Sequence, residues 1–295
     1  MMVKFLRHLL PILSPSFVPQ QQDKVLTKVM SNLDTFLPFR QHGTSLANAR
    51  REIYLDVDRL GRDDGVWFFN VLAFRGVFFG SPFSRSDHYR WFDSLADWES
   101  FRITEKEEEE KYDREQYYVC KHCYGQSQTG RELSLLSSYW NQRTLWKEKF
   151  RKPDKPTVAN VHRWLTSRVN NQTSKKTSTL FSNIGALSAL LICSDLVEVG
   201  IIAMPSAKEW ANLVHKLGMG SKSGMEMCKF IDEDSSRDDF SSAFASLDQA
   251  LQMELLEEEK EAMGYNVIML EHALCKIQRI SKRVSEKVFM SEVLK

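Results

Sequence analysis

Apolar residues recur every three or four positions through most of the chain, the spacing that places them on one face of a helix. The pattern is clearest in residues 25–37, 46–60, 135–150, 241–262 and 267–288. We therefore predict a mainly α-helical, bundle-like protein that contains αα-hairpins.

Two stretches depart from this pattern, and we predict a small irregular or β element near each of them. Residues 52–80 include the most aromatic part of the chain, whose spacing fits either a helical face or two short strands. In both cases this part is core, so Asn70 and Arg75 need polar partners. The second stretch, residues 115–125, carries a pair of cysteines.

Changes in composition along the chain suggest three parts. Residues 1–22 form a leader or tail, residues 23–168 an N-terminal helical domain with the cysteine pair, and residues 180–295 a C-terminal helical domain. The polar run between the last two is the best candidate for a boundary.

The N-terminal leader and the cysteines indicate the compartment. The leader carries Lys4 and Arg7 and no acid before Asp23. This composition fits an organelle-import presequence as well as a first helix that rests on the domain, whereas the clean apolar core of a secretory signal is missing. The five cysteines form no disulfide framework, which favours a reducing compartment. We predict an intracellular protein of the cytoplasm or nucleus, with organelle import as an alternative and without a membrane span.

Charge is balanced over the whole chain but not locally. With 40 Lys and Arg against 39 Asp and Glu, the formal charge is +1, so no overall field attracts nucleic acid or an anionic membrane. Residues 139–176, however, hold ten basic residues and two acids. The basic residues that we expect to contact nucleic acid are Arg143, Lys147, Lys149, Arg151, Lys152, Arg163 and Arg168.

Aromatic residues are interleaved with these bases, at Trp140, Trp146, Phe150 and Trp164. Basic groups can neutralise phosphates while aromatic faces stack on unpaired bases. Helical spacing instead assigns Trp146 and Phe150 to a buried face, which leaves a solvated basic face as the other interpretation. Acidic stretches at 105–115 and 232–261 could also pair with these bases inside the protein.

The cysteine pair Cys120 and Cys123 has the spacing of the first half of a zinc site. A structural zinc needs four ligands, and the spacing predicts none nearby; His88 and His162 could complete a site only from a distance. Two thiols without a metal are the simpler interpretation. We therefore expect no cofactor and keep zinc as the alternative.

Asp56 and Asp58 raise the question of a metal-dependent enzyme, because two carboxylates at one strand end could bind a cation. The helical pattern over 46–60 instead places both acids on the flanks of a helix, pointing away from the core. No complete catalytic motif occurs in the chain.

Three functions follow, in order of preference. The first is a non-catalytic interaction or scaffold protein that acts through helix packing, with a protein partner or a second copy, through the apolar stripe of the C-terminal helices. The second is a nucleic-acid-binding protein that uses residues 139–176, with or without structural zinc. The third is a metal-dependent enzyme that uses Asp56 and Asp58. The stripe consists of Val267, Leu270, Leu274, Ile277, Val284 and Val288.

Overall fold

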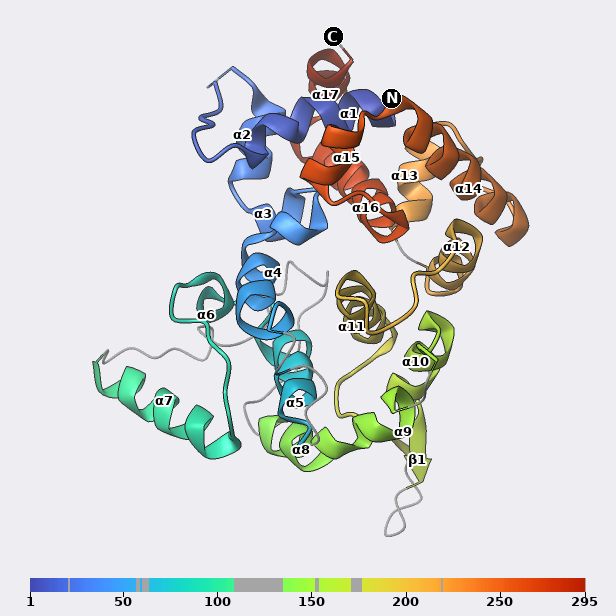
Figure 1. Cartoon of the computed structure of the whole chain (residues 1–295). Helices are drawn as coiled ribbons and strands as arrows, with labels where there is room; N and C mark the ends of the chain where they lie inside the picture. The colour runs from blue at the N-terminus through green and yellow to red at the C-terminus, as the bar shows by residue number, and fades with distance from the viewer. Residues whose placement is uncertain are drawn as a thin grey trace. The chain divides into compact units, whose positions relative to one another are not determined.

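The computed structural model describes residues 1–20, 22–56, 59, 64–108, 135–151, 154–170, 177–218 and 220–294. Helices dominate these residues, which confirms the predicted mainly α-helical fold (Figure 1). The strands of the described residues, β1 (Arg168–Asn170) and β2 (Thr177–Thr179), form one antiparallel pair in which Arg168 lies opposite Thr179. Among the same residues, no helix is both long enough and apolar enough to cross a membrane.

The chain divides into two compact units that do not follow chain order. Unit 1 consists of Met1–Gly43 and Pro205–Lys295, and unit 2 of Thr44–Met204. The predicted domains were contiguous in sequence, and their boundaries stay a prediction.

Unit 1 consists of helices drawn from both ends of the chain. They are α1 (Met2–Leu9), η1 (Leu10–Leu13), α2 (Lys24–Met30), α3 (Leu33–Phe36), η2 (Arg40–His42), α12 (Ala207–Lys216), α13 (Ser221–Met227), α14 (Arg237–Glu254), α15 (Glu257–Met263), α16 (Val267–Val284) and α17 (Glu286–Val293). Helix α16 is central, because α2, α3, α12, α13 and α17 all contact it.

Local signals fix many helix ends of unit 1. Ser206 and Glu209 form the predicted capping box at the start of α12, where each side chain accepts a hydrogen bond from the other residue's backbone amide. Gly264 ends α15 in the left-handed conformation, and Asn266 then caps α16 by accepting hydrogen bonds from two backbone amides.

Two helices predicted as continuous are broken. Residues 25–37 form α2 and α3, because Asn32 leaves the helical conformation and caps α3 by accepting a hydrogen bond from the amide of Thr35. Residues 241–262 span α14 and α15, because Leu255 is extended and its side chain is buried. In both places a cap or a burial requirement outweighs helical propensity.

A buried lysine joins the two segments of unit 1. Lys276 on α16 is 4% exposed, and its Nζ donates to the carbonyl oxygens of Asp34 (3.0 Å) and Thr35 (2.8 Å). These carbonyls lie at the end of the short helix α3, where a cation is favourable.

Unit 2 consists of helices, helical turns and the strand pair. The helical elements are α4 (Thr44–Ala49), η3 (Arg50–Tyr54), α5 (Val66–Ala73), η4 (Phe74–Phe78), α6 (Pro82–Arg85), α7 (Leu95–Glu108), α8 (Leu135–Gln142), η6 (Arg143–Trp146), α9 (Lys147–Phe150), α10 (Val158–Leu165) and α11 (Ala186–Glu198).

The aromatic stretch within residues 52–80 is helical, so the helical alternative holds there and the strand alternative was wrong. Every residue of α5 is buried, and the irregularity takes the form of two π-helical turns, η3 and η4. Asn70 finds the partners that its burial requires, because its side chain donates to the carbonyl of Phe92 (2.9 Å) and accepts from the amide of Phe92 (3.0 Å). The second predicted element, at 115–125, lies outside the described residues.

Candidate nucleic-acid interface

Helical turns α8, η6 and α9 follow one another directly and carry the first part of the basic segment. Their apolar side packs on α5: Trp146 lies 5.4 Å from Trp67 and Phe150 lies 5.9 Å from the same ring, between ring centroids. The predicted burial of Trp146 is therefore confirmed, and Phe150 is half-buried. These rings pack together as a core, and the lysines and arginines of the segment lie around it.

Helix α10 extends the same aromatic core. Trp164 stacks on Phe68 with centroids 5.6 Å apart, and it also contacts Phe150 (6.0 Å) and Phe181 (5.1 Å). The side chain of Thr157 begins α10, as predicted, by accepting a hydrogen bond from the amide of Asn160. Because α9 and α10 meet through their aromatic sides, their basic residues lie on the outside of one core.

A glycine sets how closely α5 approaches the basic segment. Gly65 precedes α5 with φ 71°, and a Cβ on this residue would lie 2.4 Å from the carbonyl oxygen of Arg143. Both the left-handed conformation and the close approach require glycine. The turn at Arg143 therefore packs directly against the backbone that precedes α5.

The basic side chains are accessible to solvent to different degrees. Arg151, Lys155, Arg163 and Arg168 are exposed, whereas Arg143, Lys147 and Lys149 are half-buried. We call these seven residues the basic face. Lys152 is outside the part of the chain that the structure describes.

Within the described ranges, no ion pair joins an acid to Arg143, Lys147, Lys149, Lys155, Arg163 or Arg168. Lysines and arginines that are not neutralised keep their charge available for an external anion. Of the acids that could have paired with them, residues 109–115 are outside the described part, and the stretch 232–261 belongs to unit 1.

Trp140 and Arg143 form a cation–π pair on α8 and η6. The guanidinium carbon of Arg143 lies 3.9 Å from the centroid of the Trp140 ring, and its Nη1 donates to the carbonyl of Trp140 (2.8 Å). Phe69 also contacts the Trp140 ring in a T-shaped arrangement, with ring centroids 5.2 Å apart. Trp140 and Arg143 are both half-buried.

The proposed zinc ligands are only partly described. Cys120 and Cys123 lie outside the described residues, so zinc binding stays a prediction. His162 is buried on α10, with its Nε2 2.9 Å from the carbonyl oxygen of Ala186, whereas His88 is exposed and follows α6 by three residues. Figure 1 places α6 and α10 on opposite sides of unit 2. The described residues contain no cluster of three or more potential metal ligands.

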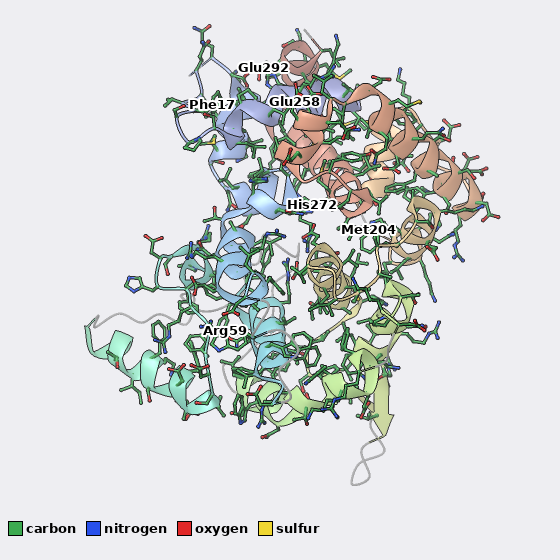
Figure 2. The ribbon with its side chains drawn as sticks, viewed as in Figure 1. Phe17, Arg59, Met204, Glu258, His272 and Glu292 are labelled. Carbon is green, nitrogen blue, oxygen red and sulfur yellow. The ribbon has the colours of Figure 1, made fainter. Side chains whose placement is uncertain are left out.

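The carboxylate pair is also only partly described. The side chain of Asp56 is 37% exposed and forms an ion pair with Arg59 (2.9 Å), which is labelled in Figure 2; Asp58 is outside the described part. Arg59 also lies over the ring of Trp91, 5.1 Å from its centroid. An exposed carboxylate already paired with arginine does not provide a ready cation site, and the enzyme hypothesis stays a prediction.

The C-terminal apolar stripe is largely used within unit 1. Val267, Leu270, Leu274 and Ile277 are all less than 9% exposed, covered by the helices that surround α16, and Val284 and Val288 are half-buried. The main observation behind the interaction or scaffold hypothesis therefore has an explanation inside the chain. That hypothesis stays a prediction.

Unit 2 contains a buried polar network that the sequence showed only in part. Arg75 on η4 donates to both carboxylate oxygens of Asp195 on α11, at 2.6 and 2.7 Å, and Tyr54 on η3 donates to the same carboxylate at 3.0 Å. The side chains of Arg75 and Asp195 are 1% and 0% exposed. Burial, together with the charge of Asp195, raises the pKa of Tyr54 well above its usual value. Asp195 interrupts an otherwise apolar helix, which was the available signal for this network.

Unit 1 also contains a half-buried thiol beside a buried carboxylate. The thiol of Cys275 donates to Glu271 (3.0 Å), one turn earlier on α16. Burial raises the pKa of both groups, and the charge of Glu271 raises that of Cys275 further. A thiol whose pKa is raised in this way stays protonated and is a poor nucleophile, so this pair is unsuited to nucleophilic catalysis.

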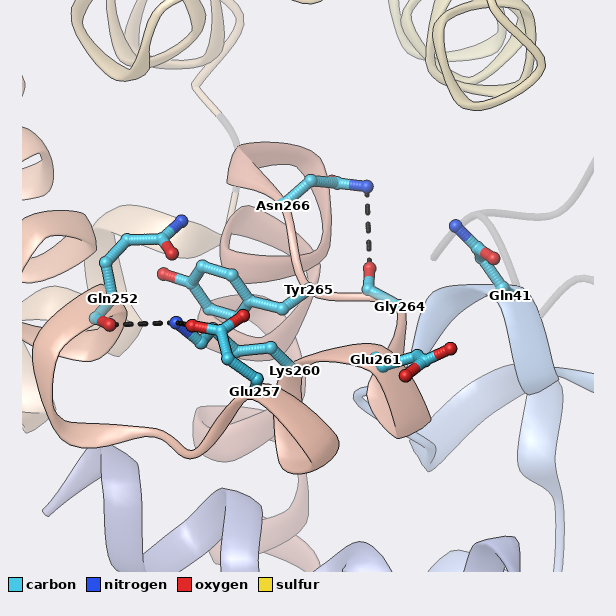
Figure 3. A pocket seen from close by; sticks show the side chains of 8 residues that line it. All are labelled: Gln41, Gln252, Glu257, Lys260, Glu261, Gly264, Tyr265 and Asn266. Carbon is cyan, nitrogen blue, oxygen red and sulfur yellow. Dashed lines mark hydrogen bonds and ion pairs between the residues drawn. The ribbon is translucent and has the colours of Figure 1, made fainter.

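A polar pocket of about 450 Å³ opens on unit 1 (Figure 3). It is lined by Gln41, Gln252, Glu257, Lys260, Glu261, Gly264, Tyr265 and Asn266. Its lysine is already bound, because Nζ of Lys260 donates to the carbonyl of Gln252 (3.0 Å) and to Glu257 (2.5 Å). Tyr265 donates to Asp248 (2.8 Å). These groups satisfy one another and present no catalytic arrangement.

Comparison of the chain with protein-family models, with curated proteins and with solved structures gave no match in any of the three. Function is therefore inferred from the side chains of the chain itself.

Proposed function

We propose that this protein binds nucleic acid through the basic face of unit 2. The supporting observation is that six basic residues of this face have no ion-pair partner among the described residues and surround an aromatic core. They are Arg143, Lys147, Lys149, Lys155, Arg163 and Arg168. Phosphates are the ligands that such a surface neutralises, and release of their counterions drives binding.

The arrangement of the lysines and arginines fits contact with several phosphates along a nucleic-acid strand. Arg143, Lys147 and Arg151 recur at four-residue intervals along η6, α9 and the residue that follows α9, and each keeps at least part of its side chain accessible to solvent. Arg163 and Arg168 add charge from α10 and β1. Local charge of this kind is compatible with the balanced charge of the whole chain, because screening limits each interaction to about 10 Å at ordinary salt.

Charge reversal at three of these positions tests the proposal. We expect the triple change Arg143→Glu, Lys147→Glu and Arg151→Glu to weaken binding of a labelled oligonucleotide strongly at low salt. Log affinity falls as log salt rises, and the variant should make this negative slope shallower by about 2. Each lost phosphate contact removes about 0.7 from the magnitude of the slope for a single strand. Fluorescence anisotropy between about 50 and 200 mM salt measures both effects.

The matched control reverses three exposed lysines of unit 1, Lys208, Lys216 and Lys282, which changes the net charge of the chain equally. The control should retain most of the binding and most of the salt slope. Equal losses in the two triple variants would show that only net charge matters, and the basic face would then not be the binding surface.

A further inference from the structure

The tryptophans of this chain differ sharply in exposure. Six of the seven are buried, and only Trp140 is half-buried. Among the aromatic residues that the sequence interleaves with the bases, Trp146 and Trp164 are committed to the core and Phe150 contacts them through it. Trp140 is therefore the tryptophan of the basic segment that a ligand can reach.

The guanidinium of Arg143 stacks on the Trp140 ring and adds a positive charge to it. It lies over the ring at 3.9 Å and is oriented by the hydrogen bond to the carbonyl of Trp140. The backbone carbonyl of Arg143 lies close to Gly65, where a side chain would not fit. No carboxylate among the described residues pairs with Arg143, so its remaining accessible N–H donors can meet an external acceptor.

We infer that the Trp140–Arg143 pair is a base-stacking site and that the nucleic acid bound by the basic face is single-stranded. This inference rests on the proposed function and specifies its ligand. In a duplex the faces of the bases are stacked on their neighbours, and a side chain reaches only base edges and phosphates. An unpaired base can stack on an aromatic ring or on a guanidinium plane.

The neighbouring lysine fits the same ligand. Lys147 follows Arg143 by four residues in the same helical run, and its side chain is partly accessible to solvent. Its ammonium group has no ion-pair partner among the described residues and can neutralise a backbone phosphate of the bound strand. The segment thus combines the two components of single-strand recognition, a stacking platform and a positively charged track.

The experiment measures how tightly the full chain binds three anionic probes. They are an oligothymidylate of about 15 nucleotides, a duplex of the same length, and heparin, which has no nucleobases. We expect Trp140→Leu to weaken oligothymidylate binding by about 5- to 100-fold while changing duplex and heparin binding by less than about twofold. Trp140→Phe keeps an aromatic face and should recover most of the loss. Tryptophan emission should be quenched by oligothymidylate in the wild type and much less in Trp140→Leu.

The outcomes separate this inference from the function on which it rests. If Trp140→Leu and the wild type bind oligothymidylate equally, or if all three probes are weakened alike, the stacking site is wrong. The proposed function still holds if the triple charge reversal weakens binding in the same assay. If the wild type binds none of the probes, both proposals fail. Should Trp140→Leu not fold, equal shielding of wild-type tryptophan from acrylamide by oligothymidylate and heparin overturns the stacking site.

Discussion

Replacing Asp195 by asparagine is expected to lower the free energy of unfolding of unit 2 by about 3–5 kcal/mol. The variant keeps the shape of the side chain but removes the charge that faces Arg75, whose side chain is 1% exposed. Both carboxylate oxygens of Asp195 accept hydrogen bonds from that guanidinium, and one also accepts from Tyr54. The large effect comes from leaving a buried cation without its partner, since an intact buried pair is itself of modest net value.

Urea unfolding followed by tryptophan fluorescence measures this effect, because six of the seven tryptophans lie in unit 2. The control is Glu52→Gln, which removes the charge from the more exposed ion pair with Arg51 in the same unit. We expect that change to cost about 1 kcal/mol or less. A loss below about 1 kcal/mol for Asp195→Asn as well would mean that the buried network contributes no more than a surface pair.

A second variant separates the charge from the packing. Replacing both partners, as Arg75→Met with Asp195→Leu, removes the unpaired charge along with its counterion. We expect this double variant to be more stable than Asp195→Asn, because hydrophobic residues of similar volume can replace a buried ion pair. A double variant that is less stable than Asp195→Asn would show that Tyr54 and the neighbouring rings depend on the ions themselves.

Helix type and helix ends could be predicted from the sequence wherever the signal is local. Ser206 with Glu209, Thr157 and Gly264 act within one turn of their own helices, and the structure uses each as its residue type suggests. The break at Asn32 has a local signal of the same kind, an N-cap asparagine, which the regular apolar spacing of residues 25–37 outweighed in the prediction. The break at Leu255 depends on which side chains the rest of unit 1 buries, and periodicity carries no information about that.

The sequence also could not predict which helices, distant in the chain, pack on α16. The apolar stripe of α16 indicates that a partner helix exists, but its pattern is the same whether the partner is another molecule or the same chain. In the structure α2 and α3, from the first 43 residues, pack on α16, and Lys276 binds carbonyls about 240 positions earlier in the chain. A pairing at this separation leaves no mark in local composition.

The basic face was predictable in composition but not in its accessible aromatic residue. Helical spacing correctly assigned Trp146 to the core. It did not distinguish Trp140, because that residue's exposure depends on how α8 lies on α5 and on Phe69. The stacking of Arg143 on Trp140 follows from a spacing of three residues, which the sequence contained and which helical geometry brings together.

Replacing Gly224 by alanine is expected to destabilise unit 1 by about 3 kcal/mol, the upper part of the range for overpacking. Gly224 lies on α13 where this helix crosses α16, and a Cβ there would lie 2.1 Å from the carbonyl oxygen of Leu274 and 2.7 Å from its carbonyl carbon. These are backbone atoms of an 18-residue helix, so no flexible side chain can move aside. The two helices must separate, which uncovers the apolar side chains between them.

The matched control is Gly220→Ala, four residues earlier. Its Cβ would meet only the side chain of Cys275, with the sulfur at an ordinary 3.6 Å, and its φ of −63° suits alanine. Alanine in such a position restricts the unfolded chain, so we expect unchanged stability or a gain of up to about 1 kcal/mol. Hydrogen exchange of the α16 amides should therefore accelerate in Gly224→Ala and stay as slow as in the wild type in Gly220→Ala. Equal exchange rates in the two variants would mean that α13 can shift on α16 without loss of stability, and the close crossing at Gly224 would then contribute nothing to unit 1.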